Sequence, residues 1–146
     1  MQKTKSQVQR ILESVAVLRS RAHRIRVRIG ELEARCAKQT GAYGIHPRGT
    51  GLTTEEVWDI LCDERERLIT QLEKLQQLEH LIQRRIDRLP NALWRKILRY
   101  RYLDGLSFAQ VTLKLREDTG HSYSKVHLYR LHRTALEALE AEWNNL

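Results

Sequence analysis

Basic and hydrogen-bonding side chains gather in one stretch near the end of the chain, KVHLYRLHRTALEALE. If this stretch is a helix, its leucines and alanines form one apolar stripe and its polar side chains lie elsewhere. Such a helix suits the major groove of double-stranded DNA. Arg130 can donate to O6 and N7 of guanine, and Lys125 and Arg133 can neutralise phosphates. Tyr129 and His127 can contact sugar or base.

A shorter helix is predicted just before it, in the string LSFAQVTLKL. Asp104-Gly105 is typical of a turn, Ser107 is expected to cap the helix, and Phe108, Val111 and Leu115 have the spacing of one buried face. The polar string REDTGHSYS is expected to separate this helix from the next. Two helices joined in this way predict a helix-turn-helix whose reading helix covers about residues 124–140. The alternative is an ordinary amphipathic helix pair with a solvated basic face.

LSFAQVTLKL followed by LYRLHRTALEAL resembles region four of bacterial sigma factors, and still more the ArpU-like late transcription regulators of phages, which carry a sigma-region-four-like domain. The resemblance covers residues 89–139. It implies that Leu106, Ser107, Val111 and Leu115 lie on the scanning helix, with Gln110 where an acidic residue is usual. It implies a core face of Leu128, Leu131, Ala135, Leu136 and Leu139 on the recognition helix. It further implies that Lys125, His127, Tyr129 and Arg130 occupy the positions that face DNA in the family.

The sequence departs from this family in two ways. The segment between Leu115 and Leu128 is several residues longer than the tight sigma turn, so the recognition helix is expected to begin near Ser122 or Ser124. The segment before Leu89 does not resemble the promoter-melting regions of a complete sigma factor. The full predicted DNA-binding set is Ser124, Lys125, His127, Tyr129, Arg130, Arg133, Ser107 and Gln110.

The first part of the chain, residues 1–89, predicts a long helical hairpin. Apolar residues from Val8 to Cys36 alternate steps of three and four, and leucine or isoleucine recurs every seven residues from Leu61 to Leu89. Helices are therefore expected over about residues 4–38 and 54–88, joined antiparallel by a Gly-rich loop over 40–53. The predicted fold is all-α, a two-helix coiled-coil hairpin followed by a helix-turn-helix domain over 90–146. Pro90 is expected in the first turn of the next helix, and Trp58 and Trp143 are interpreted as packing residues.

The basic run RSRAHRIRVR has two interpretations. In the antiparallel register Arg26 and Arg28 are expected opposite Glu66 and Glu64, in surface ion pairs. Alternatively the run is a second phosphate-binding strip, for which Arg19, Arg21 and Arg24 are the better candidates for contact with DNA or polymerase.

Charge supports a polyanionic partner. The formal net charge is +8, and segments 1–53, 54–89 and 90–146 hold 11, 6 and 9 Lys and Arg against 3, 9 and 6 Asp and Glu. Most of the excess is thus in the N-terminal part and not in the predicted reader.

No enzyme class is indicated. The sequence has no phosphate-cradling Gly-Lys-Ser/Thr loop, no zincin histidine pair and no Gly-x-Ser-x-Gly. We therefore expect no catalytic residues, no cofactor and no metal, with Cys36 and Cys62 as reduced core thiols. No signal peptide or membrane helix is visible, so a cytoplasmic protein of a bacterial host is expected.

The leading hypothesis is a sequence-specific transcription regulator encoded by a phage or prophage, which binds double-stranded DNA and contacts RNA polymerase as the resemblance implies. A homodimer through the hairpin is expected, because a two-helix hairpin buries one side of each helix. The alternatives are a phage small terminase subunit, a DNA-packaging adaptor, and a helical protein-interaction module.

Overall fold

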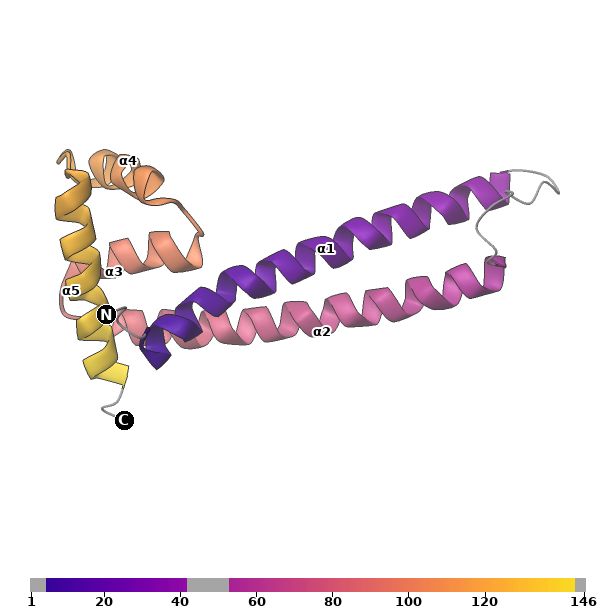
Figure 1. Ribbon diagram of the computed structural model, residues 1–146, viewed down its shortest axis with the longest axis horizontal. Helices are drawn as coiled ribbons and strands as arrows, with labels where there is room; N and C mark the ends of the chain where they lie inside the picture. Colours follow the sequence, from indigo (N-terminus) through magenta and orange to yellow (C-terminus); the bar gives the residue numbers. More distant parts are fainter. Residues whose placement is uncertain (1–4, 42–52, 144–146) are drawn as a thin grey trace. The chain divides into compact units, whose positions relative to one another are not determined.

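The computed structural model describes residues 5–41 and 53–143 of the chain (Figure 1). Its regular elements are the helices α1 (Gln7–Gly41), α2 (Thr54–Asp87), α3 (Ala92–Leu98), α4 (Phe108–Thr119) and α5 (Lys125–Trp143), with a π-helical turn η1 (Arg99–Leu103) after α3. No residue of the described ranges lies in a strand. The predicted all-helical fold class is confirmed for this part of the chain.

The two long helices begin at side-chain caps. Ser6 Oγ accepts a hydrogen bond from Gln9 N at 3.1 Å ahead of α1. Ahead of α2, Thr53 Oγ1 accepts from Glu56 N at 3.2 Å and Thr53 N donates to Glu56 Oε2 at 3.1 Å. These reciprocal bonds satisfy backbone donors that have no partner inside the helix. Most of the predicted Gly-rich loop, residues 42–52, lies outside the described residues.

The chain divides into two compact units. Unit 1 comprises Met1–Val17 with Gln76–Leu146, and unit 2 comprises Leu18–Leu75. The division therefore falls within α1 and α2, whereas the sequence predicted a boundary at Leu89-Pro90. That boundary, as the limit of an independently folding domain, stays a prediction.

Unit 2 is built from the adjoining parts of α1 and α2, which run antiparallel (Figure 1). Its core consists of one buried row from each helix, made up of Ile29, Leu32, Cys36, Val57 and Leu61, with Ile25, Ile60 and Leu68 packed against it. In this core the buried residues of α1 follow the predicted alternation of three and four. Near the start of α1 the prediction is wrong by one residue, because Leu12 is buried and Ile11 is half-buried. Trp58 was predicted to pack and Cys62 to be a core thiol, but neither belongs to this core. Both side chains are exposed, because they project from the side of α2.

The C-terminal part of unit 1 packs α3, α4 and α5 around Ile97, Val111, Leu115 and Leu128, which are at most 1% exposed. Asn91 caps α3, because its side chain accepts hydrogen bonds from the backbone of Leu93 and Trp94. The prediction for Pro90 was thus wrong by two residues. Pro90 precedes the cap and does not lie in the first turn, since Asn91 supplies the better capping side chain.

Candidate nucleic-acid interface

The N-terminus of α4 is fixed by the capping box that Ser107 and Gln110 form. Ser107 Oγ accepts from Gln110 N at 3.2 Å, and Ser107 N donates to Gln110 Oε1 at 2.9 Å. Ser107 is the predicted cap. Both side chains are exposed, but their polar atoms already bond to the helix end, so they fix the first turn of α4.

The turn between α4 and α5 is shorter than the sequence predicted. Residues 116–119 of the expected polar break are helical, and α4 ends at Gly120, whose φ of 73° is in the left-handed region that favours glycine. Polar composition marks the exposure of these residues and not the end of the helix. The next helix starts directly after Ser124, whose Oγ accepts from His127 N at 3.2 Å. This agrees with the predicted start near Ser124.

The back of α5 packs as predicted. Leu128, Ala135, Leu136 and Leu139 are buried and Leu131 is half-buried against the core of unit 1. The front of α5 is open to solvent. All six predicted DNA-binding residues at and after Ser124 are exposed, namely Ser124, Lys125, His127, Tyr129, Arg130 and Arg133. Two of them also have partners within the helix, because Ser124 Oγ caps α5 and Arg133 Nε lies 3.8 Å from Glu137 Oε1.

Val126 was missed by the sequence reasoning. It is 61% exposed in the first turn of α5. It stands four and seven residues before Arg130 and Arg133, so these three side chains share the centre of the exposed face. An apolar residue flanked by basic ones at this spacing was the signal that could have identified it.

Aromatic contacts hold several of these side chains in place. The His127 ring stacks on Tyr123 with centroids 5.7 Å apart and an interplanar angle of 12°. The edge-to-face pair of Phe108 and Tyr129 joins α4 to α5 with centroids 4.8 Å apart. Lys125 Nζ lies 5.8 Å from the centroid of the Tyr129 ring. Ordered side chains lose less entropy on binding than free ones, so this arrangement is preorganised for a contact.

An open hollow of about 570 Å³ lies between α4 and α5, beside these aromatic rings. Its lining is mostly apolar and comprises Phe108, Ala109, Thr112, Leu113, Tyr123, Lys125, Leu128 and Tyr129. Leu113 at its edge is 61% exposed. The hollow gives this side of the helix pair a concave surface next to the basic front of α5.

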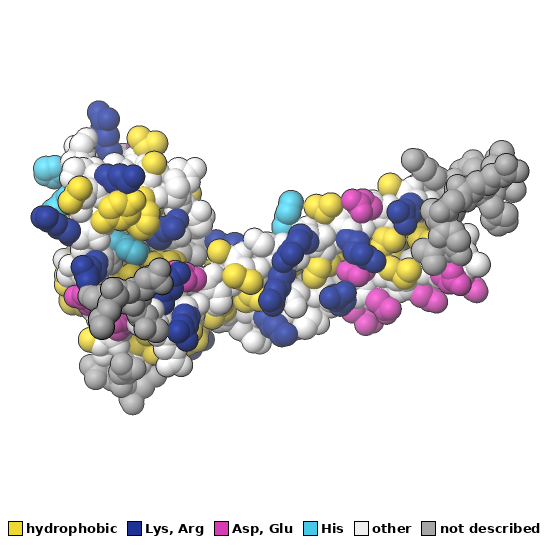
Figure 2. All heavy atoms as spheres, in the orientation of Figure 1, with side chains coloured by type: hydrophobic (Ala, Val, Ile, Leu, Met, Phe, Trp, Pro, Cys, Tyr) yellow, Lys and Arg dark blue, Asp and Glu magenta, His cyan; other side chains and the backbone are white. Residues whose placement is uncertain are grey.

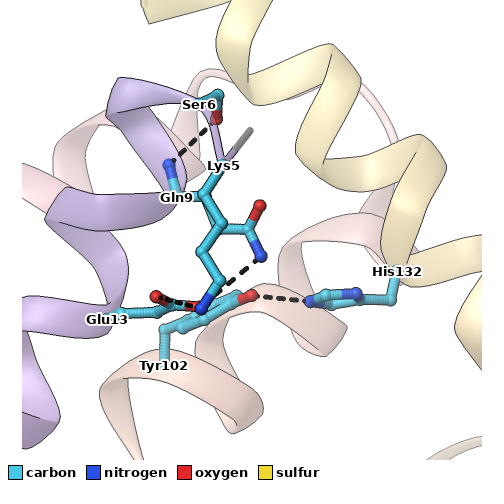
Figure 3. Close-up of polar contacts among 6 residues, drawn as sticks. All are labelled: Lys5, Ser6, Gln9, Glu13, Tyr102 and His132. Carbon is cyan, nitrogen blue, oxygen red and sulfur yellow. Dashed lines mark hydrogen bonds and ion pairs between the residues drawn. The ribbon is translucent and has the colours of Figure 1, made fainter. Parts of the chain in front are cut away.

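A half-buried pair of polar side chains, Tyr102 and His132, joins η1 to the middle of α5 (Figure 3). The Tyr102 hydroxyl and His132 Nε2 are 2.8 Å apart, and the Phe108 ring packs edge-on against His132 with centroids 5.0 Å apart. Burial, assisted by the charge of Arg101, lowers the pKa of His132 to about 4, so the ring is neutral at pH 7. Burial likewise raises the pKa of Tyr102 to about 12, against the effect of Arg101. His132 therefore adds no positive charge to α5 at pH 7.

In the basic run of α1, Arg28 forms the ion pair that one interpretation expected, whereas several other arginines are exposed. Arg28 Nε lies 3.2 Å from Glu64 Oε1, as the expected register required, and Arg67 Nη1 approaches the same oxygen at 3.4 Å. The expected pair of Arg26 with Glu66 is not formed within the described residues. Arg21 and Arg24 are exposed and Arg19 is half-buried. Figure 2 shows most of the acidic side chains of unit 2 on α2, the lower of the two long helices in Figure 1.

The described residues hold no group of three or more His, Cys, Asp and Glu side chains placed for a metal ion. Neither described cysteine is in a disulfide, and only Cys36 is buried. None of the described helices is both long and apolar enough to span a bilayer.

Comparisons of the chain with models of known protein families, with curated proteins and with solved structures found no match.

Proposed function

We propose that this chain is a sequence-specific, non-catalytic DNA-binding transcription regulator that reads the major groove with the N-terminal half of α5. The division of charge along α5 carries the proposal. All its cations precede all its carboxylates: Lys125, Arg130 and Arg133 come first, and Glu137, Glu140 and Glu142 follow. The helix dipole adds positive potential at the same end. The N-terminal half of a recognition helix is the part that meets base edges.

The surroundings of α5 support the same role. The capped start of α4, the left-handed Gly120 and the cap at Ser124 set the helix ends that a helix-turn-helix would present to DNA. In this proposal Arg130 donates to guanine, Lys125 and Arg133 contact phosphates, and the N-terminus of α4 approaches the sugar-phosphate backbone.

The biological setting in this proposal comes from the sequence resemblance to ArpU-like phage regulators and sigma region four. On that basis the protein acts in the cytoplasm of a bacterial host, at a promoter-region site, in contact with RNA polymerase. The N-terminal coiled-coil hairpin then positions the reader.

The first test is selection of bound fragments from random and genomic DNA pools by the full chain at about 50 and 200 mM salt. One enriched motif that survives the higher salt is the expected result. Unselective binding that is lost at the higher salt would contradict sequence-specific regulation, since non-specific affinity comes from phosphate contacts alone.

Substitutions then test the reading helix on the selected site. Arg130→Ala is expected to cost about 1–3 kcal/mol and to relax specificity at one base pair, because a bidentate guanine contact is lost. Lys125→Ala is expected to weaken binding to all sequences and to reduce the salt dependence by about one phosphate contact.

Lys74→Ala is the matched control for Lys125→Ala, since it removes the same charge from an exposed position on α2. An equal loss in both lysine variants would mean that net charge, and not α5, sets the affinity. Unchanged affinity in Arg130→Ala would overturn the assignment of α5 as the reading helix.

A further inference from the structure

Unit 2 leaves a partly apolar side of its helix pair uncovered. Trp58, Cys62, Arg65 and Ile69 follow one another at steps of four, three and four along α2, so their side chains lie on one side of the helix. Trp58 is 44% exposed and Ile69 is 56% exposed. Tryptophan is among the residues that contribute most to binding at interaction surfaces.

This side includes α1 as well as α2. Arg65 Nη2 lies 3.0 Å from Glu33 Oε1 across the two helices. Next to this ion pair is a shallow hollow of about 280 Å³, lined by Glu33, Cys36, Ala37, Trp58, Leu61 and Arg65. We call the surface made by this hollow with Trp58, Cys62 and Ile69 the side face of unit 2.

The two helices of unit 2 carry opposite charge. Residues 18–37 of α1 hold six Arg and two Glu, a net charge of +4. Residues 54–75 of α2 hold seven Asp and Glu against three Lys and Arg, a net charge of −4. A second copy of the same hairpin therefore offers an acidic helix for α1 and a basic helix for α2.

Arg26 and Glu66 provide a specific example of this complementarity. The ion pair of Arg28 with Glu64 sets the register, and one step of two residues from it, backward in α1 and forward in α2, brings Arg26 and Glu66 to the same level. Both are exposed. Within the part of the chain that the structure describes, neither takes part in an ion pair, so both charges are available to another molecule.

We propose that unit 2 pairs with a second copy of this chain through the side face, giving an antiparallel four-helix bundle in which α1 of each copy lies on α2 of the other. A two-fold axis parallel to the helices produces this arrangement. The other isologous choice, with the axis across the helices, would place α1 on α1 and oppose two basic helices, which electrostatic repulsion disfavours.

The axis parallel to the helices also preserves each residue's level. Trp58 of one copy then faces the hollow of the second copy at the same level, and Arg26 of each copy meets Glu66 of the other. The apolar side chains supply the buried centre of the interface and the charged pairs form its rim.

The first test is the mass of the full chain in solution, by light scattering or sedimentation, between about 1 and 100 µM. A dimer is expected. Trp58→Ala is expected to weaken it at least about tenfold, since loss of a central aromatic anchor commonly costs that much. Leu113→Ala, which removes a still more exposed apolar side chain on α4 of unit 1, is the control and is expected to leave the dimer intact.

Charge reversal gives the sharper test. Arg26→Glu and Glu66→Arg are each expected to weaken the homodimer several-fold, and a mixture of the two variants is expected to recover the mixed dimer. Arg24→Glu is the control, because Arg24 projects about 160° around the helix from Arg26. Circular dichroism verifies that every variant is folded.

A wild-type monomer over the whole concentration range, a ring of more than two subunits, or charge-reversal variants that dimerise like wild type would each overturn the proposal. No DNA enters these measurements, so a failure here leaves the proposed DNA binding standing, and a failure of DNA binding leaves the dimer untouched.

Discussion

At the scale of single residues, the surroundings of His132 restrict its chemistry. It is held between the Phe108 ring and the Tyr102 hydroxyl, and Figure 3 shows Glu13 of α1 beside Tyr102. Its imidazole carries no charge at pH 7, because burial keeps the ring neutral. A titratable group kept neutral in this way makes folding stability depend on pH.

We predict that the free energy of unfolding decreases as the pH falls from about 6.5 to about 4. The pKa of His132 is lowered from 6.5 to about 4 in the folded protein, so in this window the unfolded chain takes up a proton that the folded protein does not. After allowance for the partial exposure of the ring, the loss between pH 7 and pH 5 is about 1 kcal/mol. Urea denaturation at the two pH values measures it.

His132→Asn keeps a hydrogen-bonding side chain but removes the titration, and should reduce this pH dependence. His80→Asn, at an exposed position on α2, is the control and should retain the wild-type dependence. An unchanged slope in His132→Asn would mean that other groups cause the acid sensitivity.

Val126 carries a second residue-scale prediction, which depends on the proposed reading of DNA by α5. Its exposed side chain, on the same face as Arg130, is suited to contact a thymine methyl group. Replacing the relevant thymine by uracil in the selected site should weaken wild-type binding by about 1 kcal/mol, the value of one buried methyl. Val126→Ala should bind both sites with similar affinity. Equal sensitivity to uracil in wild type and variant would exclude this contact.

At the scale of the elements, capping residues set where the helices of the candidate interface begin. We predict that Ser107→Ala costs about 1 kcal/mol of stability, because the first turn of α4 loses the acceptor for Gln110 N. Urea denaturation measures the change. Ser122→Ala, at an exposed position between α4 and α5, is the control and should be near neutral. A near-neutral Ser107→Ala would show that packing alone holds the start of α4.

Some elements could be predicted from the sequence because their signals are local. Ser107, the Asp104-Gly105 turn and the apolar spacing of α5 all act within a few residues. The end of α4 was mislocated because a polar composition reports exposure, whereas the positive φ of Gly120 ends the helix.

The π-helical turn η1 had no such local signal. Its hydrogen bond from Asp104 N to Arg99 O, at 3.0 Å, spans five residues and follows directly on α3. Side chains of this turn contact other parts of unit 1. Leu103 is buried, and the Tyr102 hydroxyl meets His132 on α5. Tertiary contacts between residues about thirty positions apart cannot be inferred from the periodicity of either segment.

At the scale of the whole molecule, the heptad pattern predicted the two long helices but not how they are shared between compact units. A periodic seam specifies which side of a helix is buried, and it leaves the partner open. The buried residues Val8, Leu12 and Val15 belong to unit 1, together with the residues from Gln76 onward, whereas Ile29 and Leu61 belong to unit 2. The beginning of α1 is therefore a part of the unit that contains the candidate interface.

This division predicts which helices respond to a core mutation. Leu12→Ala removes a side chain that is 1% exposed and should destabilise unit 1 by about 2–5 kcal/mol. Amide hydrogen exchange should then accelerate in α5, although Leu12 and α5 are more than a hundred residues apart in sequence. Exchange reports such regional opening, because compact units open with their own free energies.

Leu61→Ala is the matched substitution in unit 2, where Leu61 is 0% exposed. It should accelerate exchange in residues 18–37 and 54–75 and leave the buried amides of α5 protected. If instead both substitutions accelerate α5 equally, the continuous helices α1 and α2 couple the two units into one cooperative fold. If only Leu61→Ala affects α5, the assignment of the start of α1 to unit 1 is wrong. The comparison thus tests whether the candidate interface depends for its stability on the first helix of the chain.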